Sequence, residues 1–440
     1  MRAIVLLGLL CVAQSAAAQL GLPPVRLPAV PAVGVPALPA AGLLAPASDT
    51  AAVLGELDPR ALRELRQQRI RELLRRHRDV LEADPDGAPI VRGELLAFAP
   101  GAATLELAAA AGYTRLREQP LGELGTRIVV LHAPDDTARA LARLRSLDPS
   151  ANFDFNHVYL TGGALPAAAP PSSTPPAAPL PAGAAASAVR VGLIDDGVDA
   201  HHEALRTLTI HGFGCGGTAI PAVHGTAVAS LLAGRADRFR GAAPGAELYA
   251  ADVFCGRPTG GAADEIAAAF AWLMHAQVPV INVSLVGPAN RTLESVVAAA
   301  VAHGHLVVAA VGNDGPAAPP LYPAAWPGVV GVTAVDARQR VLPEAERGPQ
   351  VKLAAPGAAM AAAQSPHGYA LVRGTSFAAP LVAGLLALEL RAPDRSEADR
   401  VLADLERRAL HPGAPGPDPA YGYGIVGADL APPPSLARAQ

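Results

Sequence analysis

The segment Val189-Arg190-Val191-Gly192-Leu193-Ile194-Asp195-Asp196-Gly197 decides the fold of the larger part of this 440-residue chain. It is a mostly apolar run without the alternation of a half-exposed strand, which is typical of a strand buried in a parallel sheet. The run ends at a carboxylate, Asp195. Open α/β sheets place their working groups outside the carboxyl ends of their strands. Asp195 is therefore the first candidate functional residue.

Strand and helix patterns alternate after this segment. Apolar runs predict strands, and longer runs with helical spacing predict helices. The expected strands cover residues 246–254, 278–285 and 305–313, and the expected helices cover 224–234, 263–276, 292–304 and 381–390. Such an alternation predicts an α/β domain over residues 188–430, with a doubly wound, mostly parallel sheet covered by helices on both faces.

A smaller domain is expected over residues 89–162. Its patterns follow the order strand, helix, two strands, helix, strand. This βαββαβ order predicts a small α+β ferredoxin-like fold. Before it, residues 54–83 carry apolar side chains at roughly helical spacing among many arginines, which predicts an amphipathic basic helix. Such a helix can touch anionic lipid, but we expect it to pack on the adjacent domain.

Segments rich in Pro and Ala separate these parts. Residues 19–53 are expected to form a tether and residues 163–187 a linker, with a short tail at 431–440. Residues 1–18 combine one Arg, a short apolar run and a small-residue end, which predicts a cleaved secretory signal peptide. We therefore expect export to the periplasm or the extracellular space, without stable membrane insertion.

Composition and cysteine usage narrow the function. The net charge is −4, and no basic stripe runs through the second half, which argues against nucleic-acid binding. Once the signal peptide is removed, Cys215 and Cys255 are the remaining cysteines. Two cysteines in an oxidising compartment predict one disulfide. A pair of buried free thiols is the alternative.

Two further segments carry reactive side chains, and a third carries a candidate hydrogen-bond donor. His224 opens the helix His224-Gly225-Thr226-Ala227, and Ser376 opens the helix that follows Gly374-Thr375-Ser376-Phe377-Ala378-Ala379-Pro380. Asn313 ends a buried strand between two glycines, where its amide can project into a cleft. A carboxylate, an imidazole and a hydroxyl are the groups that nucleophilic acyl transfer requires.

In the order Asp, His, Ser, these segments closely resemble the signatures of the subtilisin-like serine proteases (subtilases, peptidase family S8) over about residues 188–430. The resemblance implies a serine endopeptidase in which Ser376 is the nucleophile and His224 is the general base and then acid. Asp195 would orient and stabilise the imidazole, with Asp196 as its competitor for that role. Asn313 would donate to the oxyanion.

The same resemblance implies a substrate cleft. Ser284-Leu285-Val286 looks like the family's edge strand, which pairs with an extended substrate. Val286 stands where the family commonly has Gly, and Leu321 stands where a small residue often floors the primary pocket. We therefore expect a shallow apolar S1 pocket for Ala- or Val-sized side chains. The expected substrate-binding residues are Ser284, Leu285, Val286, Ala310, Val311, Gly312 and Leu321.

Partners and cofactors follow from the resemblance too. The substrates would be polypeptides, and the unit at 89–162 would be a pro-domain that inhibits the enzyme within the chain. The mature enzyme, a monomer, would begin in or after residues 164–187. A permanently attached accessory domain is the alternative. No acidic loop has calcium-ligand spacing, so no metal or cofactor is expected, although many subtilases bind calcium for stability.

Three rival functions have less support in the sequence. Gly212–Gly217 contains G-x-G-x-x-G, but no helix opens from it, so the context of a dinucleotide site is missing. An α/β-hydrolase would need the order Ser, acid, His. A catalytically inactive subtilase-fold binding protein is the alternative from another class, but all the catalytic positions hold the required residue types.

Overall fold

The computed structural model describes residues 59–162, 164–167, 189–413 and 416–438. The described residues all belong to one compact unit, which lies within Ala45–Gln440. The predicted signal peptide, the tether and most of the linker lie outside the described residues. Within the described part, no helix is long and apolar enough to cross a lipid bilayer.

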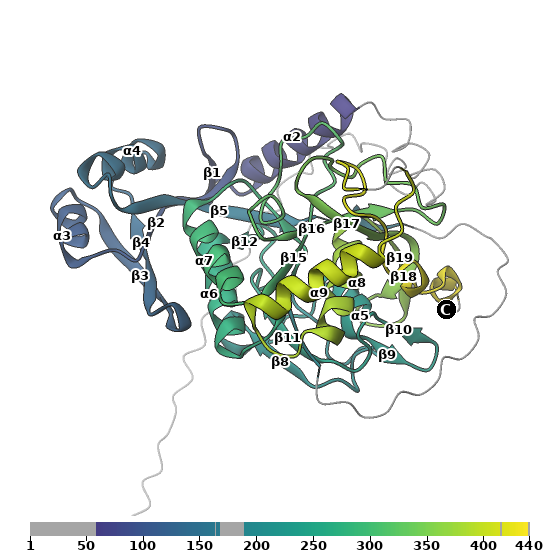
Figure 1. The fold of residues 1–440 in the computed structure, drawn as a ribbon. Helices are drawn as coiled ribbons and strands as arrows, with labels where there is room; N and C mark the ends of the chain where they lie inside the picture. The colour runs from purple at the N-terminus through teal and green to yellow at the C-terminus, as the bar shows by residue number, and fades with distance from the viewer. Residues whose placement is uncertain (1–58, 163, 168–188, 414–415, 439–440) are drawn as a thin grey trace, which may run out of the picture. The chain divides into compact units, whose positions relative to one another are not determined.

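A seven-stranded parallel sheet forms the centre of the C-terminal α/β domain (Figure 1). Its strand order is β17-β16-β15-β13-β7-β11-β8, and every neighbouring pair is parallel. The strands are β7 (Arg190–Asp195), β8 (Ile210–Phe213), β11 (Glu247–Asp252), β13 (Val280–Val283), β15 (Leu306–Ala310), β16 (Val330–Val335) and β17 (Val351–Pro356). The doubly wound parallel sheet predicted from the sequence is confirmed.

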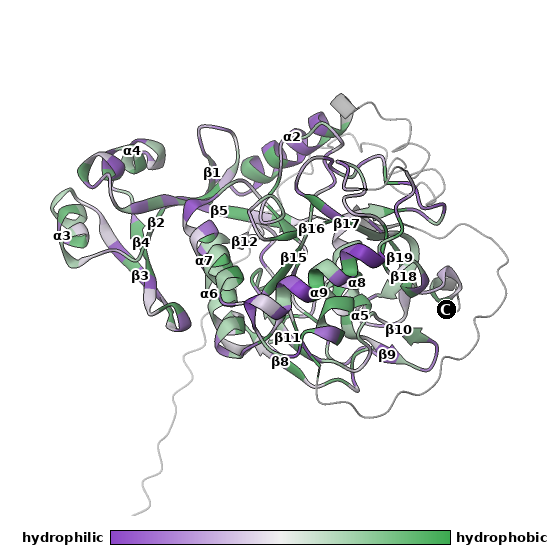
Figure 2. Ribbon diagram, viewed as in Figure 1, coloured by the Kyte–Doolittle hydropathy of each residue, from purple (hydrophilic) through white to green (hydrophobic). Residues whose placement is uncertain are grey.

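Helices cover both faces of this sheet. The helices are α5 (Val223–Ala233), α6 (Ala263–His275), α7 (Arg291–Ala302), α8 (Thr375–Glu389) and α9 (Arg395–Arg408). One buried cluster joins the sheet to α5, α8 and α9, and a second joins it to α6 and α7. Figure 2 shows α8 mostly hydrophobic, as its burial requires, whereas α9 is hydrophilic on one side.

Short strands complete the domain. They are β9 (Arg235–Ala236), β10 (Phe239–Arg240), β12 (Gly261–Ala262), β14 (Leu285–Val286), β18 (Ala358–Ala363) and β19 (Tyr369–Arg373). Single 3-10 turns cover Cys215–Gly217, Ala428–Leu430 and Pro434–Arg438. Both β12 and β14 lie at the edge of the domain, where they pair with a strand of the smaller domain.

The smaller domain has the predicted ferredoxin-like order. Its strands follow the order β5-β2-β4-β3, and all of its pairs are antiparallel. A buried cluster packs α3 and α4 on one face of this sheet. The elements are β2 (Pro89–Phe98), α3 (Ala102–Ala110), β3 (Thr114–Leu121), the 3-10 turn Gly122–Leu124, β4 (Thr126–His132), α4 (Thr137–Leu147) and β5 (Asn152–Thr161).

The basic helix is shorter than the predicted range 54–83. The helix α2 (Pro59–Arg76) ends early, and β1 (Leu81–Ala83) pairs antiparallel with β2. The reason is the turn Asp84-Pro85-Asp86-Gly87, in which Oδ1 of Asp84 accepts hydrogen bonds from the backbone N–H groups of Asp86 and Ala88. Gly87 adopts φ of +86°, which glycine tolerates best.

The predicted linker 163–187 also contains regular structure. Residues Ala164–Ala167 form β6, which pairs antiparallel with β19. Composition misled the prediction here, because backbone pairing to a neighbouring strand needs no particular side chains. Residues 168–187 lie outside the described part of the chain.

Candidate active site

Asp195 and His224 form a buried pair at the carboxyl edge of the parallel sheet. Asp195 is the last residue of β7, and His224 is in the first turn of α5. Nδ1 of His224 lies 2.7 Å from Oδ1 of Asp195, whose side chain has no exposed surface. Burial disfavours the imidazolium, but the charge and hydrogen bond of Asp195 outweigh it and raise the pKa of His224.

Asp196 has a different partner. Its Oδ1 accepts a hydrogen bond from the backbone N–H of Gly225, and its own N–H donates to Oδ1 of Asp195 at 2.8 Å. Burial and the negative charge of Asp195 raise the pKa of Asp196 to about 7. Because Asp195 alone of the two bonds Nδ1 of His224, it is the better candidate for the orienting carboxylate.

Ser376 lies in the first turn of α8, fully buried. Gly374 precedes that helix with φ of +136°, a conformation that favours glycine. The hydroxyl of Ser376 donates to the carbonyl oxygen of Ser284 at 3.3 Å. Nε2 of His224 has no hydrogen-bond partner among the described residues. A proton transfer from Ser376 to His224 therefore requires the hydroxyl to rotate away from Ser284.

Asn313 follows the end of β15 and is held by the residue before Ser376. Its Oδ1 accepts a hydrogen bond from the backbone N–H of Thr375 at 3.1 Å, and the N–H of Gly312 donates to Oγ1 of Thr375 at 3.2 Å. Nδ2 of Asn313 is buried without a partner among the described residues. This arrangement keeps an amide donor available for a developing negative charge.

The predicted substrate strand pairs with a segment of the chain itself. In β14, Leu285 pairs with Thr161 and Val286 with Leu160, and the N–H of Gly162 donates to the carbonyl oxygen of Ser284 at 3.2 Å. A Cβ atom built on Gly162 would lie 2.9 Å from Oγ of Ser376. The end of β5 therefore fills the cleft next to the nucleophile.

The floor of the cleft is apolar and close-packed. Ala310 and Val311 are fully buried at the end of β15. A Cβ atom on Gly312 would lie 2.9 Å from Cδ1 of Leu321, and one on Gly162 would lie 3.3 Å from Cγ1 of Val286. Val286 thus limits the space around Gly162 beside Ser376, and Leu321 limits the space around Gly312.

Tyr159, three residues before Gly162, packs against Gly287. Its ring is fully buried, and its hydroxyl donates to the carbonyl oxygen of Pro288 at 2.8 Å. A Cβ atom on Gly287 would lie 2.5 Å from the ring. Glycine at position 287 therefore makes room for an aromatic side chain.

Two groups of potential metal ligands occur in the described part of the chain. One consists of Cys215, Cys255 and Asp252, but the structure joins these two cysteines in a disulfide after β8 and β11. The other consists of Asp195, Asp196 and His224. Bonded cysteines offer no thiolate to a metal, and the second group is the hydrogen-bonded pair described above with Asp196 beside it.

Sequence patterns did not single out two residues of this site. Thr375 fixes both Gly312 and Asn313 through its backbone and hydroxyl groups. Glu346 is fully buried, and a Cβ atom on Gly312 would lie 2.6 Å from its Oε1. Only the position of Thr375 directly before Ser376 could have suggested its role. No pattern around Glu346 indicates that it reaches the cleft.

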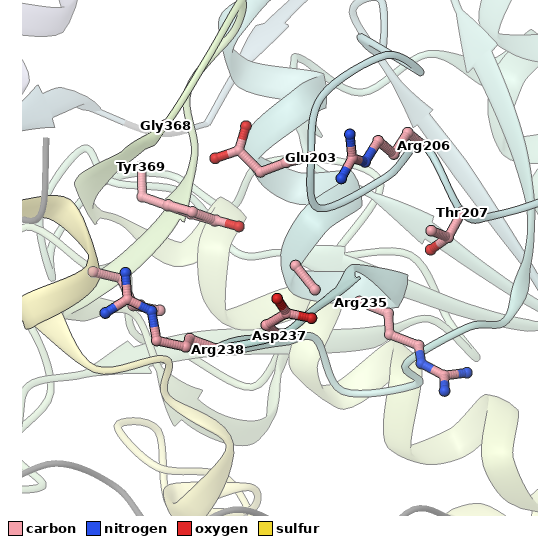
Figure 3. A pocket seen from close by; sticks show the side chains of 10 residues that line it. Glu203, Arg206, Thr207, Arg235, Asp237, Arg238, Gly368 and Tyr369 are labelled. Atoms are coloured by element: carbon pink, nitrogen blue, oxygen red, sulfur yellow. The ribbon is translucent and has the colours of Figure 1, made fainter.

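A separate polar recess of about 340 Å³ is lined by residues from four places in the chain (Figure 3). Glu203 comes from the turns after β7, Asp237 from the β9–β10 hairpin and Tyr369 from β19. Arginines accompany these acids, so charges of both signs surround the recess. None of the predicted site residues lines it. The lining residues are Glu203, Arg206, Thr207, Arg235, Ala236, Asp237, Arg238, Gly368, Tyr369 and Leu436.

Known proteins resemble this chain in sequence and in fold. A family model described as "Subtilase family" matches residues 186–424, which is more than half of the chain. The chain belongs to the subtilase family. This subtilase is 32% identical over 260 residues to Subtilisin BL of Lederbergia lenta, a match that covers 57% of this chain and 92% of the relative. It is therefore a serine endopeptidase, and polypeptides are its substrates.

Further relatives extend the comparison. The subtilase is 28% identical over 257 residues to the "Minor extracellular protease Epr" of Bacillus subtilis (strain 168), covering 56% of this chain and 38% of that protein. Its fold is similar to that of fervidolysin from Fervidobacterium pennivorans, described as a keratinolytic enzyme related to subtilisin. That match has a TM-score of 0.63 at 20% identity and covers 78% of this chain and 61% of fervidolysin.

Proposed function

We propose that this subtilase hydrolyses peptide bonds through an acyl-enzyme on Ser376. Ser376 attacks the carbonyl carbon while His224 takes its proton, and His224 then protonates the leaving amine. Asp195 keeps Nδ1 of His224 protonated, which leaves Nε2 as the base. The oxyanion receives hydrogen bonds from Nδ2 of Asn313 and from the backbone N–H of Ser376. Water then releases the acyl group by the reverse steps.

This proposal rests on the hydrogen-bonded pair Asp195–His224 and on the approach of the Gly162 backbone to the hydroxyl of Ser376. The 2.7 Å hydrogen bond fixes the imidazole, and the unpartnered Nδ2 of Asn313 is a donor without another task. A subtilase-fold binding protein without activity would have no need of either feature. None of these steps uses a metal or a cofactor.

We also propose that the chain is made as a zymogen whose ferredoxin-like domain is the inhibitor. The end of β5 occupies the cleft in the antiparallel pairing expected of a substrate. Asp154 accepts a hydrogen bond from the N–H of Arg291 at the start of α7, and Asn156 bonds Asp264 in the first turn of α6. Buried polar contacts of this kind fix the register of the docked strand.

The first self-cleavage is proposed to follow Gly162. Gly162 stands beside Oγ of Ser376, and β6 pairs with β19 only two residues further along the chain, Ala164 with Arg373. The substrate backbone is thereby held on both sides of the bond to be cut. The mature enzyme would then begin at Gly163, slightly before the region 164–187 expected from composition.

Substrate preference is proposed to follow the same segment. A Cβ atom at the P1 position of Gly162 would lie 2.9 Å from Oγ of Ser376 and 3.3 Å from Cγ1 of Val286, which favours Gly or Ala there, a smaller residue than the Ala- or Val-sized one expected from the sequence. Gly287 admits an aromatic residue at P4, the place of Tyr159. Export through the predicted signal peptide is proposed as well, in keeping with the word "extracellular" in the name of the Bacillus subtilis relative. The mature enzyme is proposed to act as a monomer.

One set of experiments tests these proposals. A fluorophosphonate should label the processed protein and fail to label the Ser376→Ala variant, which should also stay uncut. N-terminal sequencing of active material should begin at Gly163. A peptide library should show Gly or Ala at P1 with Tyr, Phe or Trp at P4. A preference for Phe, Tyr or Lys at P1 would contradict the pocket, and labelling that survives Ser376→Ala would contradict the nucleophile.

A further inference from the structure

An arginine of the basic helix α2 reaches the residue that follows the proposed oxyanion donor. Nη1 of Arg66 lies 2.6 Å from Oδ2 of Asp314, and the side chains are 23% and 14% exposed. Asp314 directly follows Asn313 in the chain. The basic helix thus makes an ion pair next to the catalytic groups, although it precedes the whole ferredoxin-like domain.

A second carboxyl group lies behind Asp314. Glu346 is fully buried, and both of its carboxyl oxygens lack a hydrogen-bond partner among the described residues. Its backbone N–H donates to the carbonyl oxygen of Gly312 at 3.1 Å, and the N–H of Gly315 donates to that of Glu344 at 2.8 Å. These hydrogen bonds hold the segments of Asp314 and Glu346 together beside the turn that carries Asn313. Asp314 and Glu346 are called the acidic recess below.

The cations that face this recess come from α2. Burial raises the pKa of Asp314, and the charges of Arg66 and Arg69 act in the opposite direction. Arg66 and Arg69 are three residues apart and therefore lie on the same side of the helix. Arg66 also opposes the effect of burial on Glu346. A helix outside the C-terminal domain thus supplies the counter-ion of Asp314, whereas burial and the charge of Asp314 keep Glu346 protonated by raising its pKa to about 9.

We propose that α2 is a second inhibitory arm of the N-terminal segment, which docks Arg66 in the acidic recess of Asp314 and Glu346. This inference rests on the proposed zymogen. The strand at 158–162 is the first arm, and hydrolysis after Gly162 cuts its covalent link to the enzyme. The Arg66 contact is untouched by that cut, so the cleaved segment stays anchored beside Asn313 after hydrolysis.

Two linked contacts hold more tightly than either alone. While one arm is bound, the other remains at high local concentration and rebinds before the segment can diffuse away. The ion pair is partly buried, so its attraction is stronger than that of an exposed pair. Release of the segment should therefore be slow compared with cleavage.

The test compares the times of cleavage and of activity in the full-length chain. Wild type, Arg66→Met and Arg63→Met are incubated, and samples are assayed for the cut by gel and N-terminal sequencing and for hydrolysis of a small chromogenic peptide. Methionine keeps most of the apolar stem of arginine and removes its charge. Arg63 is exposed on the same helix and does not pair with Asp314, so it is the matched control.

In wild type, activity should lag behind cleavage. Arg66→Met should cut at the same rate but shorten this lag about tenfold or more, while Arg63→Met and Arg66→Lys should behave as wild type. Sodium chloride at about 1 M should shorten the lag more in wild type than in Arg66→Met, in which the pair Arg117–Asp264 still joins the segment to α6. A lag that Arg66→Met leaves unchanged would overturn the second arm alone. Wild-type activity that appears together with the cut would overturn the proposed inhibition, and the second arm with it.

Folding of the variants has its own control. Each substitution is repeated with Ser376→Ala, which keeps the chain uncut, and thermal unfolding is followed. An unfolding midpoint of Arg66→Met close to that of Arg63→Met assigns the shortened lag to the contact itself. A shortened lag with a midpoint well below that of Arg63→Met and Arg66→Lys would mean that general loosening releases the segment, which would contradict a specific arm.

Discussion

The backbone N–H of Thr375 donates a hydrogen bond to Oδ1 of Asn313 at 3.1 Å. A backbone N–H can only donate, so the atom that faces it is the amide oxygen and Nδ2 must lie on the other side. Thr375 thereby orients the amide of Asn313, the proposed oxyanion donor. A donor that is already held in place meets the condition for electrostatic stabilisation without reorganisation.

Replacement of Asn313 by Ala should lower kcat by about 10²–10³, the scale known from subtilisins for this kind of donor. The reason is that Nδ2 meets negative charge which exists only in the transition state. The KM for a small peptide should change little. Steady-state kinetics of the processed enzyme measures both constants. An increase in KM at constant kcat would show that Asn313 binds substrate and transition state equally.

The two neighbouring aspartates should differ sharply in their effect on kcat. Asp195→Asn should lower kcat by about 10⁴, because an amide at this place favours the wrong tautomer of His224. Asp196→Asn keeps an acceptor for the N–H of Gly225 and should cost less than about tenfold. Kinetics of the two variants after processing compares them directly. A larger loss from Asp196→Asn would reverse the assignment.

The pH dependence of kcat/KM should report the charge around His224. His224 must be neutral to accept a proton, and its raised pKa places the acid limb above the ordinary value of 6.5. The negative charge of Asp196 contributes to that rise, so Asp196→Asn should shift the limb to lower pH. Asp237→Asn, in the β9–β10 hairpin, is the control and should leave the limb in place. An upward shift in Asp196→Asn would contradict the electrostatic assignment.

Glu346→Gln should stabilise the fold more at pH 8 than at pH 5. Burial and the charge of Asp314 raise the pKa of Glu346 to about 9 from an ordinary value of 4.5. Between pH 4.5 and about pH 9, Glu346 is protonated in the folded chain and ionised in the unfolded chain. Folding therefore takes up a proton, and the free-energy cost of this uptake grows with pH over that range. Glutamine needs no proton.

Differential scanning calorimetry in the Ser376→Ala background measures this without self-digestion. Above about pH 9 the gain should stop growing, because the folded wild type then loses the proton too. An equal gain in stability at pH 5 and pH 8 would show that the packing of the glutamine side chain, and not the ionisation of Glu346, causes the gain. A loss at pH 8 would contradict the neutral state of Glu346.

The disulfide between Cys215 and Cys255 should contribute about 4 kcal/mol to the free energy of unfolding. It closes a loop with a sequence separation of 40, and the loop-closure entropy of the unfolded chain gives that magnitude. Cys215→Ser together with Cys255→Ser should show the loss in urea unfolding of the Ser376→Ala protein. Reduction of the parent protein with dithiothreitol should reproduce it. If neither treatment changes stability, the bond does not form in the protein.

Much of the fold, and the places of the candidate reactive residues in it, were predictable from local patterns. A strand buried on both faces produces an apolar run, and its end marks the sheet edge, so Asp195 and Asn313 were found from the positions where their runs stop. His224 and Ser376 open apolar helices with clear helical patterns. The ferredoxin-like order was predictable for the same reason, since each of its elements has its own period.

Contacts made by the backbone or by single side chains across long distances were not predictable. The strand at 164–167 has the composition of a linker, and its pairing with β19 depends on where the chain lies after Gly162. Arg66 is one arginine among many in its helix, and only the fold shows that it meets Asp314. Thr375 and Glu346 likewise act through positions that the folded chain creates.

The pairing of β5 with both β12 and β14 has a consequence for the lifetime of the mature enzyme. In the proposed zymogen, departure of the cleaved segment would take a shared strand away from these two short edges and leave their backbone groups without partners. Exposed edges of this kind accept any extended polypeptide. The nearest such polypeptides in a concentrated solution are partly unfolded copies of the same protease. A high concentration of the enzyme should therefore shorten its lifetime, and dilution should lengthen it.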